Sequence, residues 1–145
     1  MTTHNVFTLK RIPSEDAALY KGLRVEGLDE SPEAFGASYS DRGSLVGIAG
    51  LRIPKQEKLK HKATLWGMYI KPEARGNGLA KQILLQIIEI AKETTEEILL
   101  TVVVSNVSAI TLYENLGFIE YGREPRALKI QDHYHDEILM RLPLT

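Results

Sequence analysis

The sequence predicts a mixed α/β fold, in which helices cover a mixed sheet. Short segments rich in β-branched and large apolar residues recur, most clearly at residues 45–53, 63–70 and 97–104. Between them, residues 79–91 carry apolar side chains every three or four positions, which is the period of a helix with one buried face. A chain of 145 residues, 43% of them hydrophobic, has material for one core. We therefore expect a single domain, residues 1–145.

Composition narrows the class of protein. Lysine plus arginine (18) nearly balance aspartate plus glutamate (19), so nothing favours a nucleic-acid partner or an anionic membrane. The chain has no cysteine, which excludes disulfides, thiolate metal sites and a cysteine nucleophile. The N-terminus lacks the apolar core of a signal peptide, and no apolar run approaches the ~20 residues that span a bilayer. We therefore expect a cytoplasmic protein.

The first part of the chain predicts a strand and then a helix. Residues 5–12 alternate well enough for a strand, and Pro13 ends it. Ser14 is a candidate N-cap, and acidic residues follow it in the first turn of a helix that runs to about Leu28.

The next part predicts strands joined by turns. A short strand is expected at residues 37–40, and the turn residues 41–44 lead into the strand at 45–53. The charged residues 55–62 are expected to form a solvated loop. In the following strand, Gly67 predicts a bulge or a close backbone approach.

The remaining elements are a buried strand, a short helix and two final strands. Residues 97–104 form an almost continuous β-branched and leucine run, which is typical of a strand buried on both sides. Ser108 is a candidate N-cap for a helix through Leu116, and Gly117 supplies the left-handed residue that ends it. Two strands, about 118–127 and 136–142, then surround a polar turn at residues 129–136.

That polar turn contains His133 and His135, which would share one face if the strand extended that far. With Asp132 and Asp136 beside them they could form a metal site, but a polar hairpin turn explains the pattern better. We expect no metal.

The segment KPEARGNGLAK, residues 71–81, lies between a strand and the long helix. Unpaired backbone N–H groups in the first turn of a helix, together with its dipole, form an anion site. Gly76 and Gly78 would let a ligand approach the main chain, and Arg75 or Lys81 would add positive charge. A phosphate or pyrophosphate fits this segment. An ordinary strand-to-helix turn fits it about as well, so the segment alone does not decide.

Two motifs together carry a resemblance to a known family. Arg75, Gly78 and Ala80 fill, in order, the pattern Gln/Arg-x-x-Gly-x-Gly/Ala. Further along, the segment SNVSAITLYENLGF has an asparagine, an alanine, a tyrosine and a Gly-Phe pair at matching positions: Asn106, Ala109, Tyr113, Gly117 and Phe118. With these motifs the chain resembles the bacterial members of the GNAT superfamily of acetyl-coenzyme A-dependent N-acetyltransferases. The resemblance implies the GNAT fold, with its fourth and fifth strands splayed apart.

The resemblance also implies roles for particular residues. The phosphates of acetyl-coenzyme A, the co-substrate, would lie on main-chain N–H groups of Arg75, Gly76, Asn77, Gly78, Leu79 and Ala80. The pantetheine arm would pair with the backbone of Met68, Tyr69 and Ile70 and contact Asn106. Tyr113 would protonate the departing thiolate. Read as residues alone, Tyr113 could instead be a core side chain and Asn106 a turn residue.

The acceptor would be a primary amine of a small molecule or a peptide, which attacks the acetyl group directly. The amine must first lose a proton. Glu26 is the candidate catalytic base, with Glu33 as another, although both also fit solvated surface carboxylates. The strand before the glycine segment has no carboxylate, so a base there would have to be His61. Trp66 and Tyr69 could line the acceptor cleft or belong to the core.

One departure from the family concerns the acceptor side. Such proteins usually have a further helix and a complete second strand before residues 41–47, so the chain is expected to be shortened by some tens of residues between Ser40 and Asp41. That expectation leaves a second function open, a coenzyme A-binding module without transferase activity. A free sheet edge would also allow a homodimer.

Overall fold

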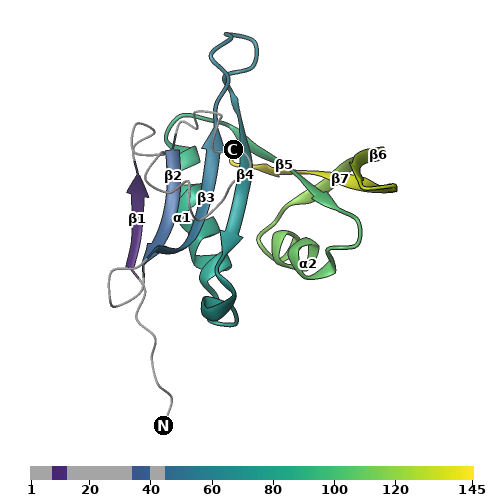
Figure 1. Cartoon of the computed structure of the whole chain (residues 1–145). Coiled ribbons are helices and arrows are strands. Elements are labelled where there is room, and N and C mark those ends of the chain that lie inside the picture. Colours follow the sequence, from purple (N-terminus) through teal and green to yellow (C-terminus); the bar gives the residue numbers. More distant parts are fainter. Residues whose placement is uncertain (1–7, 13–33, 40–44) are drawn as a thin grey trace.

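A computed structural model describes residues 8–12, 34–39 and 45–145 (Figure 1). The predicted helix from Ser14 to about Leu28, the turn at residues 41–44, and both candidate bases, Glu26 and Glu33, lie outside the described residues.

The described residues form one seven-stranded mixed sheet in the order β1-β2-β3-β4-β5-β7-β6. Every neighbouring pair is antiparallel except β4 and β5, which are parallel. The strands are β1 (Thr8–Ile12), β2 (Ala34–Tyr39), β3 (Leu45–Arg52), β4 (Lys62–Ile70), β5 (Glu97–Val103), β6 (Ile119–Ile130) and β7 (His133–Pro143). The helices are a 3₁₀ turn (Pro72–Ala74), α1 (Leu79–Lys92) and α2 (Val107–Asn115). The predicted mixed α/β fold is confirmed.

The centre of the sheet is open. Strands β4 and β5 pair only at their beginnings, where Lys62, Ala63 and Thr64 lie beside Glu97, Ile98 and Leu99. Beyond these pairs the two strands diverge, and α2 lies on the β5 side of the gap (Figure 1). The splayed central strands that the resemblance implied are therefore present.

A bulge in β4 adds to this distortion. Ile48 of β3 is opposite Tyr69, but Gly50 is opposite Trp66, so two residues of β4 face one residue of β3. Gly67 lies within the bulge and has φ of 67°, a left-handed conformation that favours glycine. The bulge predicted at Gly67 is confirmed.

The main core lies on one face of the sheet, beneath α1. Four helix residues, Ile83, Leu84, Ile87 and Ala91, are almost fully buried, as the helical period predicted. They pack with side chains of the central strands, among them Ala49, Leu51, Ala63, Leu65, Ile98, Leu100 and Met140.

Three expectations about the C-terminal half were wrong in detail. Strand β5 is fully buried on one face only, because Ile98, Leu100 and Val102 are buried while Thr101 is exposed. Helix α2 is capped by Asn106 instead of Ser108: the Asn106 side chain accepts a hydrogen bond from the Ala109 N–H at 3.3 Å. Strands β6 and β7 extend almost to one another, so the turn between them is shorter than residues 129–136.

The outer strand β6 is irregular halfway along. Its register with β7 shifts between Glu124 and Leu128, and Arg126 has φ of 53°. The Arg126 N–H donates to a carboxylate oxygen of Asp136 on β7 at 2.8 Å. The long final hairpin is therefore interrupted by a bulge.

Two adjacent leucines of α1 provide a matched test of this packing. Leu84 is 1% exposed and Leu85 is 46% exposed. Leu84→Ala should lower the free energy of unfolding by about 2–5 kcal/mol, because it removes buried methyl groups and leaves a cavity. Leu85→Ala should stay within about 0.5 kcal/mol of the wild type. Urea unfolding of both variants measures the difference, and equal losses would contradict the assignment of the buried face.

Candidate active site

The glycine segment after β4 presents backbone donors to solvent. Gly76 and Gly78 have φ of 82° and 74°, and a Cβ added to either would meet nothing within 4 Å. Gly78 is the N-cap of α1, and the Gln82 N–H donates to its carbonyl at 3.1 Å. The N–H groups of residues 79–81 precede that bond and have no partner within the helix. An anion can therefore approach several N–H groups and the positive end of the helix dipole together.

Side chains of the segment hold it in this shape. The Asn77 amide donates to the Ala74 carbonyl at 2.9 Å, and Arg75 Nε donates to the Ile70 carbonyl at 3.0 Å. The Arg75 guanidinium also lies 5.8 Å from the centre of the Tyr69 ring. The Arg75 N–H donates to the Pro72 carbonyl at 3.2 Å, so this N–H is already bonded within the segment.

Two cavities open beside this segment, and the larger of them extends to α2. The larger, which we call the α2-side cavity, has a volume of about 400 Å³. It is lined by Met68, Tyr69, Ile70, Arg75, Ala80, Asn106, Ser108, Ala109, Leu112 and Tyr113. The smaller, about 130 Å³, lies against Gly76, Gly78 and Leu79 and shares Ile70, Arg75 and Ala80 with the larger. The structure thus brings together all the predicted coenzyme residues except Asn77, which lines neither cavity.

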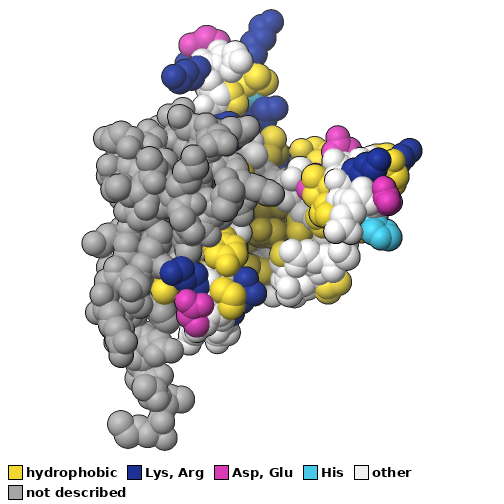
Figure 2. Space-filling view, in the orientation of Figure 1, with side chains coloured by type: hydrophobic (Ala, Val, Ile, Leu, Met, Phe, Trp, Pro, Cys, Tyr) yellow, Lys and Arg dark blue, Asp and Glu magenta, His cyan; other side chains and the backbone are white. Residues whose placement is uncertain are grey.

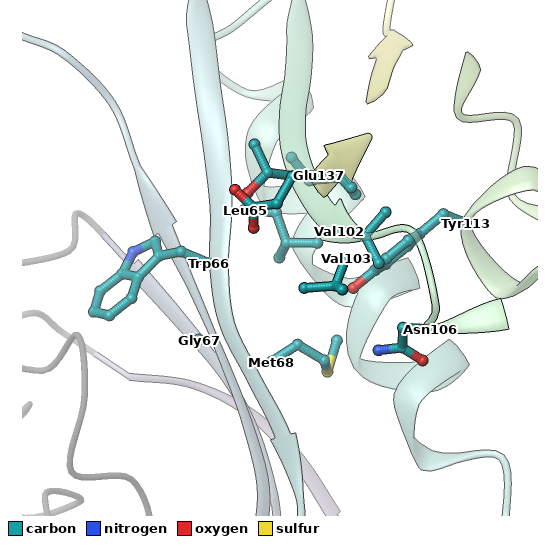
Figure 3. A pocket seen from close by; sticks show the side chains of 11 residues that line it. Leu65, Trp66, Gly67, Met68, Val102, Val103, Asn106, Tyr113 and Glu137 are labelled. Carbon is teal, nitrogen blue, oxygen red and sulfur yellow. The ribbon is translucent and has the colours of Figure 1, made fainter. Parts of the chain in front are cut away.

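A third cavity lies in the gap between β4 and β5, and we call it the β7-side cavity. Its volume is about 380 Å³, and it is lined by Leu65, Trp66, Gly67, Met68, Leu100, Thr101, Val102, Val103, Asn106, Tyr113 and Glu137 (Figure 3). In the space-filling view, hydrophobic side chains line a hollow between the sheet and the α2 side of the molecule (Figure 2). Met68, Asn106 and Tyr113 belong to both this cavity and the α2-side cavity, so the two adjoin at these residues.

Tyr113 is the buried side chain at this junction. Its residue is 8% exposed, and its ring meets the Phe118 ring edge-on with centroids 5.6 Å apart. The hydroxyl projects toward the gap, near Met68 and Asn106 (Figure 3). Burial raises the pKa of Tyr113 above its usual value, so the hydroxyl is protonated at neutral pH. The residue is therefore both a packed ring and an available proton donor.

The Asn106 side chain can fill two roles, as the cap of α2 and as a contact to a ligand. Its Oδ1 atom caps α2 by accepting a hydrogen bond from the Ala109 N–H, and it also accepts one from the Ser108 hydroxyl at 3.4 Å. Its amide nitrogen remains to donate to a ligand, because the residue lines both large cavities. The two interpretations offered by the sequence, turn residue and ligand contact, are compatible.

Other candidate residues have different surroundings. Trp66 points away from Tyr113 (Figure 3), and its ring lies over Gly50 of β3 with the Arg52 guanidinium 5.3 Å from its centre. His61 precedes β4, at the end of the strand opposite the glycine segment. His133 and His135 do lie on β7, but among the described residues no group of three or more His, Asp or Glu side chains could hold a metal ion.

The structure adds Glu137, which sequence reasoning missed. It lines the β7-side cavity together with Tyr113. The available signal was the alternation of β7, which places Glu137 on the opposite face from the apolar Ile138, Met140 and Leu142.

The family model described as Acetyltransferase (GNAT) family matches residues 4–118. The chain therefore belongs to the GNAT acetyltransferase family. It is 34% identical over 139 residues to [ribosomal protein bS18]-alanine N-acetyltransferase of Escherichia coli K12, covering 89% of this chain and 90% of that protein.

Solved structures agree on the fold. A GNAT-family acetyltransferase from Streptococcus pneumoniae superimposes with a TM-score of 0.82 at 22% identity, covering 95% of this chain and 99% of that one. A protein from Salmonella typhimurium, solved with its cofactor acetyl-CoA, superimposes with a TM-score of 0.77 at 16% identity over 97% of this chain and 95% of that one.

These comparisons correct the expected shortening between Ser40 and Asp41. A chain missing some tens of residues would leave much of its relatives uncovered, whereas 90–99% of each of these proteins is covered. Strand β2 is also six residues long and pairs along its length with β3. Separately, no helix in the described ranges is long and apolar enough to cross a membrane.

Two substitutions can separate the capping role of Asn106 from its ligand-binding role. Asn106→Ala should lower the free energy of unfolding by about 0.5–2 kcal/mol, because it removes the α2 cap. Asn106→Asp keeps a capping oxygen but has no amide donor, so stability should remain near wild type while coenzyme A affinity falls. Thermal unfolding and calorimetric titration with coenzyme A test this, and unchanged affinity in both variants would leave Asn106 as a cap alone.

Proposed function

We propose that this acetyltransferase transfers the acetyl group of acetyl-coenzyme A to the primary amine at a protein or peptide N-terminus, by direct attack. The observation that carries the proposal is the meeting of two cavities at Tyr113 in the gap between β4 and β5. A thioester in one cavity and an amine in the other would come together there. An alanine N-terminus is the first acceptor to try, because curated relatives 34% identical to this chain are named for the alanine of ribosomal protein bS18.

The coenzyme fits the α2 side of the gap. Its pyrophosphate would accept hydrogen bonds from N–H groups in residues 76–81, where glycine at 76 and 78 keeps the approach open. Its pantetheine arm carries amides that would pair with β4 backbone between Leu65 and Ile70. That stretch lies beyond the last pairing with β5, at Thr64, so its β5-facing edge has no neighbouring strand.

The reaction would proceed without a covalent enzyme intermediate. The neutral amine attacks the thioester carbonyl, a C–N bond forms, and the carbonyl oxygen becomes an oxyanion. A backbone N–H of the bulged β4, around Met68 to Ile70, would stabilise that charge. When the C–S bond breaks, Tyr113 donates its proton to the thiolate, and the amide nitrogen then loses its extra proton.

Tyr113 suits this role because it is protonated and partly enclosed. Burial raises its pKa, so the acidic form persists across the neutral range. Glu26, the base predicted from the resemblance, stays a prediction, since it lies outside the described residues.

The proposed acceptor can be tested with a matched set of amines. We expect acetylation of a peptide with the bS18 N-terminal sequence starting at alanine, detected by mass spectrometry as the added mass of one acetyl group. The same peptide already acetylated at its N-terminus should not react. A preference for spermidine or free amino acids over the peptide would overturn the peptide as acceptor, but the proposed acetyltransferase activity would stand.

The role of Tyr113 predicts a specific kinetic pattern. Tyr113→Phe should lower kcat by about 100-fold or more, because general acids commonly contribute 10²–10⁴-fold. Acetyl-coenzyme A affinity and stability should change little, since the ring and its contact with Phe118 remain. Free-thiol release and calorimetric titration measure the two quantities. An unchanged kcat would refute the acid role, and a matching loss of affinity would indicate a structural one.

A further inference from the structure

We infer that Glu137 is the catalytic residue that binds the acceptor's ammonium group and removes its proton. The inference rests on the proposed function, because it requires an amine acceptor in the β7-side cavity. It assigns the base to β7, a strand for which no base was predicted from the sequence.

The Glu137 side chain lies on the face of β7 that is opposite the buried core. On β7, Ile138, Met140 and Leu142 are buried in the core beneath the helices. Because side chains alternate along a strand, Glu137 lies on the opposite face, directly across from Val103 of β5. There it lines the same cavity as Thr101, Val103 and Tyr113 (Figure 3).

Glu137 differs from the other described carboxylates in its surroundings. It is half-buried, and it has no ion-pair or hydrogen-bond partner in the described part of the chain. The half-buried Glu97, by comparison, is paired with Arg141 at 3.3 Å. Partial burial of an unpaired charge is unfavourable, and a cationic ligand would relieve that cost.

The neighbours of Glu137 make the cavity more attractive to a cation. Glu124 of β6 is directly opposite Glu137 in the β6–β7 pairing, so two carboxylates share one face. His135 lies two residues earlier on β7 and on that same face, while β5 contributes the uncharged Thr101 and Val103. The cavity-lining residues of β4 are uncharged, and α2 contributes Tyr113. No described lysine or arginine lines this cavity.

Position in the cavity also distinguishes Glu137 from other bases. Among the described residues that line these three cavities, it alone is acidic. The described residues that line the small cavity beside Gly76 and Gly78, and those that line the α2-side cavity, include Arg75 but no carboxylate. A carboxylate is therefore present on the side where the amine arrives and absent from the side that holds phosphates.

The proton transfer balances simply. The ammonium group donates one proton to the Glu137 carboxylate, directly or through one water molecule, and the resulting amine lone pair forms the C–N bond. Tyr113 protonates the thiolate and regains a proton from the amide nitrogen, while Glu137 releases its proton to solvent. One proton leaves for each acetyl group transferred.

The test compares Glu137→Gln with Glu137→Asp and with Glu96→Gln, which removes an exposed carboxylate just before β5. We expect Glu137→Gln to lower kcat/KM for the alanine peptide about 100-fold at pH 7. The difference in kcat/KM between wild type and Glu137→Gln should become smaller above about pH 8, because the peptide amine, with a pKa near 7.7–8.0, loses its proton there unaided. Glu137→Asp should retain part of the activity, and Glu96→Gln all of it. Coenzyme A affinity should be unchanged throughout.

A binding experiment adds a readout that does not depend on turnover. With coenzyme A present, wild type should bind the free-amine peptide more tightly than its N-acetylated form, and Glu137→Gln should lose that difference. Wild-type activity on the peptide combined with an unaffected Glu137→Gln overturns this inference alone. A loss of kcat/KM in Glu137→Gln that is equal at every pH and is accompanied by weaker coenzyme A binding also overturns it. Absence of wild-type acetylation with any amine overturns the proposed function and the inference together.

Discussion

The structure depends on the point at which β4 and β5 stop pairing. Their parallel register ends at Thr64 and Leu99, well before either strand ends. Had the pairing continued, the sheet would be closed and neither large cavity would exist. Because it stops, β4 keeps an unpaired backbone edge, and the space that opens is wide enough for side chains from α2 and β7 to enter.

Each side of the gap is held by its own set of contacts. On the β4 side, the bulge at Gly67 and the Arg75 side chain, bonded to the Ile70 carbonyl, set where the strand ends and the anion-binding turn begins. On the β5 side, β7 pairs along the whole of β5, and the edge-on contact of Tyr113 with Phe118 anchors α2. The gap therefore lies between two walls, each with contacts of its own: β4 with the glycine segment on one side, and β5 with β7 and α2 on the other.

Much of this architecture could be predicted from sequence, because strong local patterns specify it. The apolar period of residues 79–91 specifies a helix, and the glycines at 76, 78 and 117 mark turns, each through interactions within a few residues. The structure has the helix, and all three glycines have positive φ. The cap of α2 was misplaced by two residues because Asn106 and Ser108 are both good capping residues, and only geometry selects Asn106. The role of Glu137 could not be predicted from local sequence patterns, because its place beside the gap depends on strand pairing with Val103, 34 positions earlier in the chain.

The irregular middle of β6 also has a consequence for the behaviour of the protein at high concentration. As the last strand of the sheet, β6 exposes a long backbone edge with several large apolar side chains, including Ile119, Tyr121 and Ile130. A straight edge of this kind would template the addition of further strands and promote aggregation. The bulge near Arg126, together with Pro125, which has no N–H to donate, breaks that edge into two short pieces. This distortion therefore protects the folded protein from fibre-like growth along its exposed side.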